Sequence, residues 1–173
     1  MTSGPGEDLW IATRDGTSRY DGSTVTPVDE LDEQLNQELT TIYYDRSDTL
    51  WIASRTELFA YDGSTVSYSQ VEGKPARLTA DIAEISSDDR WFATLRDGLL
   101  HYDGSSFERF TTADGLPSNA VRALSVDDQG RLWIGLQRTI ARFEDGEFKT
   151  VPRKGRARRR RGRKRARGPG GPA

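Results

Sequence analysis

The stretch AVRALSVDDQGRLWIGLQRTIARFEDGEFKTV, residues 120–151, decides the fold. It contains four short segments of strand length: AVRALSV, RLWIGL, TIARFE and EFKTV. Polar turns typical of β-hairpins separate them, such as Asp-Asp-Gln-Gly at 127–130 and Glu-Asp-Gly at 144–146. The second segment is apolar throughout, which is typical of a strand buried on both faces, whereas the last alternates and is expected nearer solvent. The stretch therefore predicts four consecutive antiparallel strands.

The same unit recurs along the chain with a period of about 41 residues. Three apolar positions keep this period, and we expect their side chains to pack in the core. A four-stranded sheet repeated at this interval is typical of a β-propeller blade. HEAT and armadillo repeats are excluded because turns every eight to ten residues or so leave no room for helices, and the dipeptides of WD40 repeats are absent. The three sets of repeat positions are Trp10, Trp51, Trp91 and Trp133; Tyr20, Tyr61, Tyr102 and Phe143; and Val25, Val66, Phe107 and Phe148.

We therefore predict an all-β fold, a β-propeller of about four four-stranded blades. The first unit begins directly at Leu9 and Trp10, so we expect its blade to lack an opening strand. The segment after Pro152 is too basic to supply that strand in a buried sheet. An open arc with exposed apolar ends is thus expected, and three outcomes stay open: a strained four-blade ring, self-association, or a fragment of a larger propeller.

Charge divides the chain near Pro152. Of the 25 Lys and Arg residues, 11 lie between Arg153 and Arg167, where no acidic residue occurs, while all 27 Asp and Glu residues lie in the remainder. Composition and repeats together predict a flexible N-terminus at 1–6, propeller repeats at 7–152 and a disordered Arg-rich tail at 153–173. The approximate repeat units are 7–35, 36–76, 77–117 and 118–152.

The tail is a candidate nucleic-acid-binding segment, because Arg and Lys side chains neutralise phosphates. It has no aromatic residue for base stacking, so the predicted binding is non-specific and salt-sensitive. Two other interpretations stay open: the tail folds back on the acidic repeats, or it is translated sequence that was never selected as protein. The candidate contact residues are Arg156, Arg158, Arg159, Arg160, Arg161, Arg163, Lys164, Arg165 and Arg167.

The segment from Ala113 to Gly135 resembles the two-component regulator propeller repeat. Gly-Leu-Pro-Ser-Asn at 115–119 and Val121 match the opening of that unit, and Leu-Trp-Ile-Gly at 132–135 matches its close. The resemblance extends over about residues 7–152. It implies a sensor-type propeller, the extracytoplasmic ligand-sensing part of bacterial membrane histidine kinases. Saccharide ligands, a periplasmic location and rings of about seven blades are what the family implies.

Candidate chemistry outside the tail is sparse. The acidic turns at 45–48, 88–89 and 127–128 lack the spacing that gathers several oxygens on one calcium ion, so hairpin turns are favoured. His101 is the single histidine and the chain has no cysteine, which argues against zinc and thiol chemistry. No nucleophile elbow or phosphate-binding loop is present. We expect no catalytic residues, no metal and no cofactor.

The sequence therefore predicts a non-enzymatic binding or sensor module. Two alternatives remain: a nucleic-acid-associated protein acting through its tail, and a hydrolase or lyase on a propeller scaffold. The first residues carry neither the basic nor the apolar region of a signal peptide, and no apolar run is long enough to span a membrane, so the chain as written is expected in the cytoplasm.

Overall fold

The computed structural model describes residues 1–6, 8–13, 16–35, 39–55, 57–63, 66–71, 74–75 and 79–152. Nearly all regular structure in these residues is β, and its strands form four antiparallel sheets, here called blades 1 to 4, as predicted. Each strand pairs with its neighbours in sequence. Blade 1 contains β1 (Thr2–Ser3), β2 (Leu9–Thr13), β3 (Gly16–Tyr20) and β4 (Val25–Pro27). Blade 2 contains β5 (Leu39–Tyr44), β6 (Leu50–Ser54), β7 (Leu58–Tyr61), β8 (Val66–Val71) and β9 (Lys74–Pro75). Blade 3 contains β10 (Thr79–Ser86), β11 (Asp89–Thr94), β12 (Leu99–Tyr102) and β13 (Phe107–Phe110). Blade 4 contains β14 (Val121–Val126), β15 (Leu132–Leu136), β16 (Ile140–Glu144) and β17 (Glu147–Val151).

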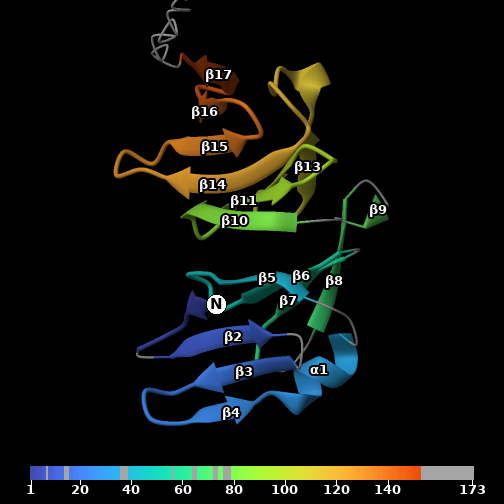
Figure 1. Ribbon diagram of the computed structural model, residues 1–173, viewed down its shortest axis with the longest axis vertical. Coiled ribbons are helices and arrows are strands. Elements are labelled where there is room, and N and C mark those ends of the chain that lie inside the picture. Colours follow the sequence, from blue (N-terminus) through green and yellow to red (C-terminus); the bar gives the residue numbers. More distant parts are fainter. Residues whose placement is uncertain are drawn as a thin grey trace, which may run out of the picture.

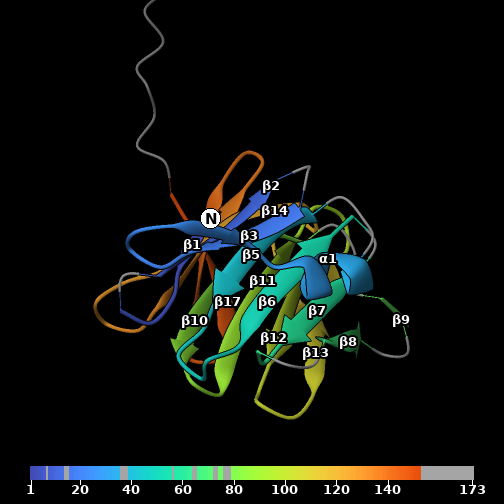
Figure 2. The same cartoon turned by 90° about the horizontal axis from the view of Figure 1, so that it is seen from below.

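The four blades are stacked face to face in chain order and form an open arc. Blades 1 and 4 lie at its opposite ends (Figure 1). The first strands β5, β10 and β14 are neighbours across the blades, so this edge is the inner edge of the arc. The view along the stack shows the sheets lying over one another, with β9 on the side away from the N-terminus (Figure 2). The predicted open arc is therefore confirmed.

The expectation that blade 1 has no opening strand is wrong. Residues Thr2 and Ser3 form the short strand β1, which pairs with Trp10 and Leu9 of β2. β1 has only two residues, against six in β5 and eight in β10, so blade 1 remains incomplete at its inner edge. The strand was missed because a two-residue segment of Thr and Ser carries no apolar alternation.

The chain crosses from the outer edge of one blade to the inner edge of the next through linkers that also carry apolar anchors. The first linker contains a helix, α1 (Asp29–Leu35), which the turn spacing did not predict. Leu31 and Leu35 lie one turn apart on this helix and are both buried between blades 1 and 2. The third linker contains the short 3₁₀ helix η1 (Thr112–Asp114), and Leu116 just after it is buried in the same way.

The core consists of the three blade interfaces rather than one central cluster. Each interface joins the Trp-bearing face of one blade to the apolar face of the next, which is how stacked repeats bury surfaces that no single repeat could cover. Trp10 lies between blades 1 and 2, Trp51 between blades 2 and 3, and Trp91 between blades 3 and 4. These three side chains are 8%, 4% and 2% exposed.

The outer hairpins of blades 1 and 3 end in the same hydrogen-bonded turn. In the turn after β12, the Asp103 carboxylate accepts hydrogen bonds from the backbone N–H groups of Ser105 and Ser106 at 2.9 and 2.8 Å. Asp21 does the same in the turn after β3. These hydrogen bonds, led by those of the backbone N–H groups, hold the pKa of both carboxyls well below its usual range. The turn after Tyr102 is closed further because the phenol donates to the carbonyl of Gly104 at 2.9 Å.

Candidate functional site

The turns that join each inner strand to the second strand gather acidic residues at one edge of the arc. They are the turns after β5, β10 and β14, which carry the acidic segments 45–48, 88–89 and 127–128. Because the same connection repeats in each blade, these turns lie at equivalent places in successive blades. They therefore form one face of the propeller.

A tryptophan–carboxylate hydrogen bond organises this face. Trp51 Nε1 donates to Asp45 and Trp133 Nε1 to Asp127, six residues earlier in each case, both at 2.7 Å. Trp91 Nε1 instead donates to Asp89 at 2.7 Å. Through these bonds the acidic residues hold the buried Trp51 and Trp91 and the half-buried Trp133 in place. Sequence reasoning missed them, although the six-residue spacing repeats in blades 2 and 4.

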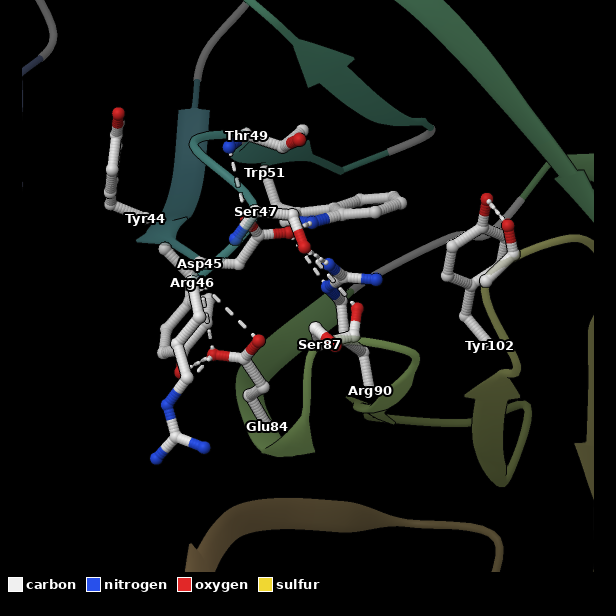
Figure 3. A network of polar contacts seen from close by, with 12 residues as sticks. Tyr44, Asp45, Arg46, Ser47, Thr49, Trp51, Glu84, Ser87, Arg90 and Tyr102 are labelled. Carbon is white, nitrogen blue, oxygen red and sulfur yellow. Dashed lines mark hydrogen bonds and ion pairs between the residues drawn. The ribbon is translucent and has the colours of Figure 1, made fainter.

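Asp45 is the anchor of a fully buried ion pair between blades 2 and 3 (Figure 3). Its carboxylate lies 2.6 Å from Nε of Arg90, and the two side chains are 0% and 4% exposed. It also accepts hydrogen bonds from the backbone N–H groups of Ser47 and Thr49. The Arg90 guanidinium donates to Ser47 Oγ at 2.9 Å and lies 5.8 Å from the centre of the Trp51 ring. Additional hydrogen bonds such as these help to offset the desolvation of a buried charge pair.

The position of Arg90 is leucine in the other three blades. The residues paired with the repeat aromatic are Leu9, Leu50, Arg90 and Leu132 in blades 1 to 4. The ion pair with Asp45 is thus a feature of the second interface alone among the described interfaces.

Glu84 on β10 is a second buried carboxylate on this face. The residue is 7% exposed, and its oxygens accept hydrogen bonds from the Arg46 backbone N–H at 3.2 and 3.3 Å. The Tyr43 phenol donates to Glu84 at 3.4 Å. The exposed Arg46 guanidinium lies 3.9 Å from the Glu84 carboxylate (Figure 3). Burial, together with the negative charge of Glu84, raises the pKa of Tyr43 to about 12. Tyr43 and Glu84 are 41 residues apart, the period of the repeat.

A groove of about 560 Å³ crosses the inner strands of blades 2, 3 and 4 at this place. Tyr43, Arg46 and Glu84 form one part of its wall. Ser125, on β14, and the turn residues 127–128 form another. The groove thus combines carboxylates, a phenol, a hydroxyl and one guanidinium with aliphatic patches from Ile85 and Leu124. It thus places hydrogen-bonding groups beside apolar contacts, a composition typical of small-molecule sites.

His101 and Asp89, two other residues considered from the sequence, do not line this groove. No group of three or more His, Asp or Glu residues that could hold a metal ion occurs among the described residues. His101 stacks on Trp91 with ring centres 4.3 Å apart, and its Nε2 lies 2.9 Å from Asp89. Of the four tryptophans, Trp133 alone is half-buried rather than buried. The candidate nucleic-acid contacts from Arg156 to Arg167 lie outside the described residues.

Residues 115–138 match the family model of the two component regulator propeller. The chain carries a two component regulator propeller repeat. This match includes the Gly115-Leu116-Pro117 opening and the Leu132-Trp133-Ile134-Gly135 close, and Leu116, Leu132 and Ile134 are buried between blades 3 and 4. The matched segment therefore includes residues that dock blade 4 on blade 3.

Solved structures confirm the propeller architecture. The extracellular domain of the hybrid two component system BT4673 from B. thetaiotaomicron is 20% identical with a TM-score of 0.70 over 87% of this chain and 21% of that chain. The corresponding domain of BT3049 from the same organism is 20% identical with a TM-score of 0.69 over 86% of this chain and 22% of that one. Virginiamycin B lyase from Staphylococcus aureus is 13% identical with a TM-score of 0.66 over 88% of this chain and 54% of that chain.

The chain thus spans about a fifth of the length of the two extracellular domains. No curated protein matches it. Within the described residues, no helix has the length and apolar character needed to cross a membrane. The likeness at these identities concerns the fold, and the family match concerns residues 115–138.

Proposed function

We propose that this propeller module senses a ligand without catalysing a reaction, and that the groove across the inner strands of blades 2 to 4 is its binding site. The observation that carries the proposal is the buried Glu84 carboxylate, which faces the groove beside the Tyr43 phenol. A groove of about 560 Å³ falls in the range of small-molecule sites, roughly 300–1,000 Å³. Its ligand contacts would come from three blades at once.

The chemistry of the groove suits a polyhydroxylated ligand such as a saccharide. Carboxylates accept hydrogen bonds from hydroxyl groups, and the guanidinium of Arg46 donates to hydroxyl oxygens. The hydroxyl of Ser125 can do both. The resemblance to sensor propellers supports the same ligand class and an extracytoplasmic location, which would replace the cytoplasmic expectation.

The proposal is tested on the full chain with an oligosaccharide array, followed by calorimetric titration of the best saccharide. The variants Glu84→Gln and Tyr43→Phe are expected to weaken binding by about tenfold or more, because each removes a hydrogen-bonding group from the groove. Glu108→Gln, on the exposed face of β13, serves as the matched control and should bind as the parent does. Unchanged affinity in both groove variants, or no binding of any saccharide, would refute the site.

Nucleic-acid binding by the Arg-rich tail is the second candidate function, favoured by its 11 Lys and Arg residues between Arg153 and Arg167. A filter-binding assay with single-stranded DNA at several salt concentrations tests it. Affinity should fall steeply with salt and disappear when residues 153–173 are deleted. An affinity that survives the deletion rules the tail out. The fold likeness to a lyase supports an enzymatic alternative only at the level of the scaffold.

A further inference from the structure

The three blade interfaces share one aromatic contact. In each interface, the repeat tryptophan of one blade meets the repeat aromatic of the following blade. Trp10 lies 6.2 Å from Tyr61 between ring centres, Trp51 lies 5.4 Å from Tyr102, and Trp91 lies 4.9 Å from Phe143. Such pairs strengthen an interface by about 0.5–1.5 kcal/mol beyond the area they bury. This aromatic contact therefore helps to hold successive blades together.

Two members of this series are left over, and they lie at opposite ends of the arc. Trp133 of blade 4 and Tyr20 of blade 1 make no aromatic ring contact with any other described residue. Both side chains are half-buried, whereas Trp91, which occupies the position of Trp133 one blade earlier, is 2% exposed. The Arg142 guanidinium lies 5.8 Å from the centre of the Trp133 ring, but neither Trp133 nor Tyr20 has an aromatic partner among the described residues. Each end of the arc thus carries the ring that would complete the aromatic pair of the other end.

The surroundings of Trp133 repeat a face that is buried elsewhere in the molecule. On blade 3, Leu99 faces blade 4 and is 0% exposed. Ile140 is the residue at the same register position in blade 4, and it is 47% exposed. The face of blade 4 that bears Trp133 is therefore exposed. It corresponds to the face with which blade 3 packs on blade 4.

The outer face of blade 1 repeats the receiving half of the same interface. Val25 is at the repeat position of Phe107, which receives the Trp51 ring of the preceding blade at 6.2 Å. Val25 is 58% exposed. Leu9 is at the position of Leu132, which is 0% exposed against blade 3, yet Leu9 is only half-buried. Blade 1 thus offers the surface that a Trp-bearing blade would cover.

We infer that two copies of this chain associate head to tail, with Trp133 of one copy packed on Tyr20 of the other. A second copy is the occupant that the structure specifies, because one chain carries both halves of an interface whose form is known from its own three blade contacts. Two such contacts related by a twofold axis close a ring of eight blades and leave neither face exposed. The inference concerns surfaces remote from the groove and is independent of the proposed ligand.

The test is sedimentation equilibrium of the full chain between about 1 and 100 μM. The parent should form dimers, and Trp133→Arg and Tyr20→Arg should each weaken dimerisation by about 30-fold or more, as truncation of a central interface aromatic does. Leu95→Arg is the control, since Leu95 is 38% exposed on the turn after β11 and belongs to neither face. Circular dichroism and urea unfolding verify that each variant remains folded.

Mixing the two variants decides the geometry. A mixture of Trp133→Arg and Tyr20→Arg chains retains one intact pair, Trp133 of the second variant on Tyr20 of the first, so heterodimers should reappear although neither variant dimerises alone. A contact between two copies of the blade 4 face would instead be abolished by Trp133→Arg and unaffected by Tyr20→Arg. Any of three results would overturn the inference: this pattern of effects for the two variants, a monomeric parent at 100 μM, or growth of the parent into open polymers.

Discussion

Replacing Arg90 by leucine introduces the residue that the other three blades carry at this position, yet we expect the change to destabilise the protein strongly. Arg90 and Asp45 are 4% and 0% exposed and lie 2.6 Å apart. Without the guanidinium, the Asp45 carboxylate loses its charged partner in a site that solvent does not reach. Loss of one partner of a buried pair costs about 3–5 kcal/mol. With an m-value near 2 kcal/mol per molar urea, the midpoint should fall by about 1.5–2.5 M.

The matched control is Arg131→Leu. Arg131 pairs with Asp127, the carboxylate that holds Trp133 as Asp45 holds Trp51, but the two side chains are 32% and 25% exposed. Because solvent can replace the lost guanidinium there, the urea midpoint should remain close to that of the parent. Tryptophan fluorescence follows the unfolding of both variants.

A third variant separates charge from packing. Adding Asp45→Asn to Arg90→Leu removes the uncompensated charge while keeping an acceptor for the Ser47 and Thr49 backbone N–H groups, so part of the lost stability should return. Equal midpoints for Arg90→Leu and Arg131→Leu, or no recovery in the double variant, would refute the reasoning that a buried carboxylate sets the cost.

Three further predictions use the same unfolding assay or a titration. Gly98→Ala should lower the free energy of unfolding by more than about 1 kcal/mol, because Gly98 has a φ of +85° and an added Cβ would lie 2.1 Å from the Phe110 carbonyl oxygen. Gly115→Ala should lower it less, because Gly115 has a similar φ of +90° but open space around the added Cβ. The lowered pKa of Asp127 stabilises the folded state above the ordinary value of 3.8, and this contribution should fade as the pH falls below it, a trend that Asp127→Asn should weaken. The raised pKa of Tyr43 favours the neutral phenol in the folded state, so stability should decline between pH 10 and about 12; if Tyr43→Phe declines as steeply over that range, the assignment is wrong.

Most of the fold could be predicted from the period of the repeat. Apolar positions at a fixed period specify which faces are buried, and Trp51 and Trp91 lie where that pattern implies. The helix α1 could not be predicted in the same way because its seven residues occupy a linker, where the strand period does not apply. The sequence does indicate this helix through Leu31 and Leu35, which are four positions apart and therefore share one helical face.

The groove and the buried ion pair could not be predicted from the sequence for a different reason. Glu84 and Arg46 belong to separate blades and meet only when the inner strands are brought side by side. Acidic residues are frequent in this chain, so their type alone does not distinguish Glu84, which is buried, from Asp88, which is exposed. The distinction depends on packing between repeats, and the sequence of a single repeat carries no information about that packing.

The self-closing turns after β3 and β12 have a consequence for how the chain folds. Asp21 and Asp103 fix their turns through hydrogen bonds to residues two and three positions ahead, so the register of each outer hairpin is set within its own turn. Strands that pair only with sequence neighbours bring together residues close in the chain, which favours rapid folding. Blades 1 and 3 can thus acquire the strand alignment of their outer hairpins during synthesis, before the next blade has been made.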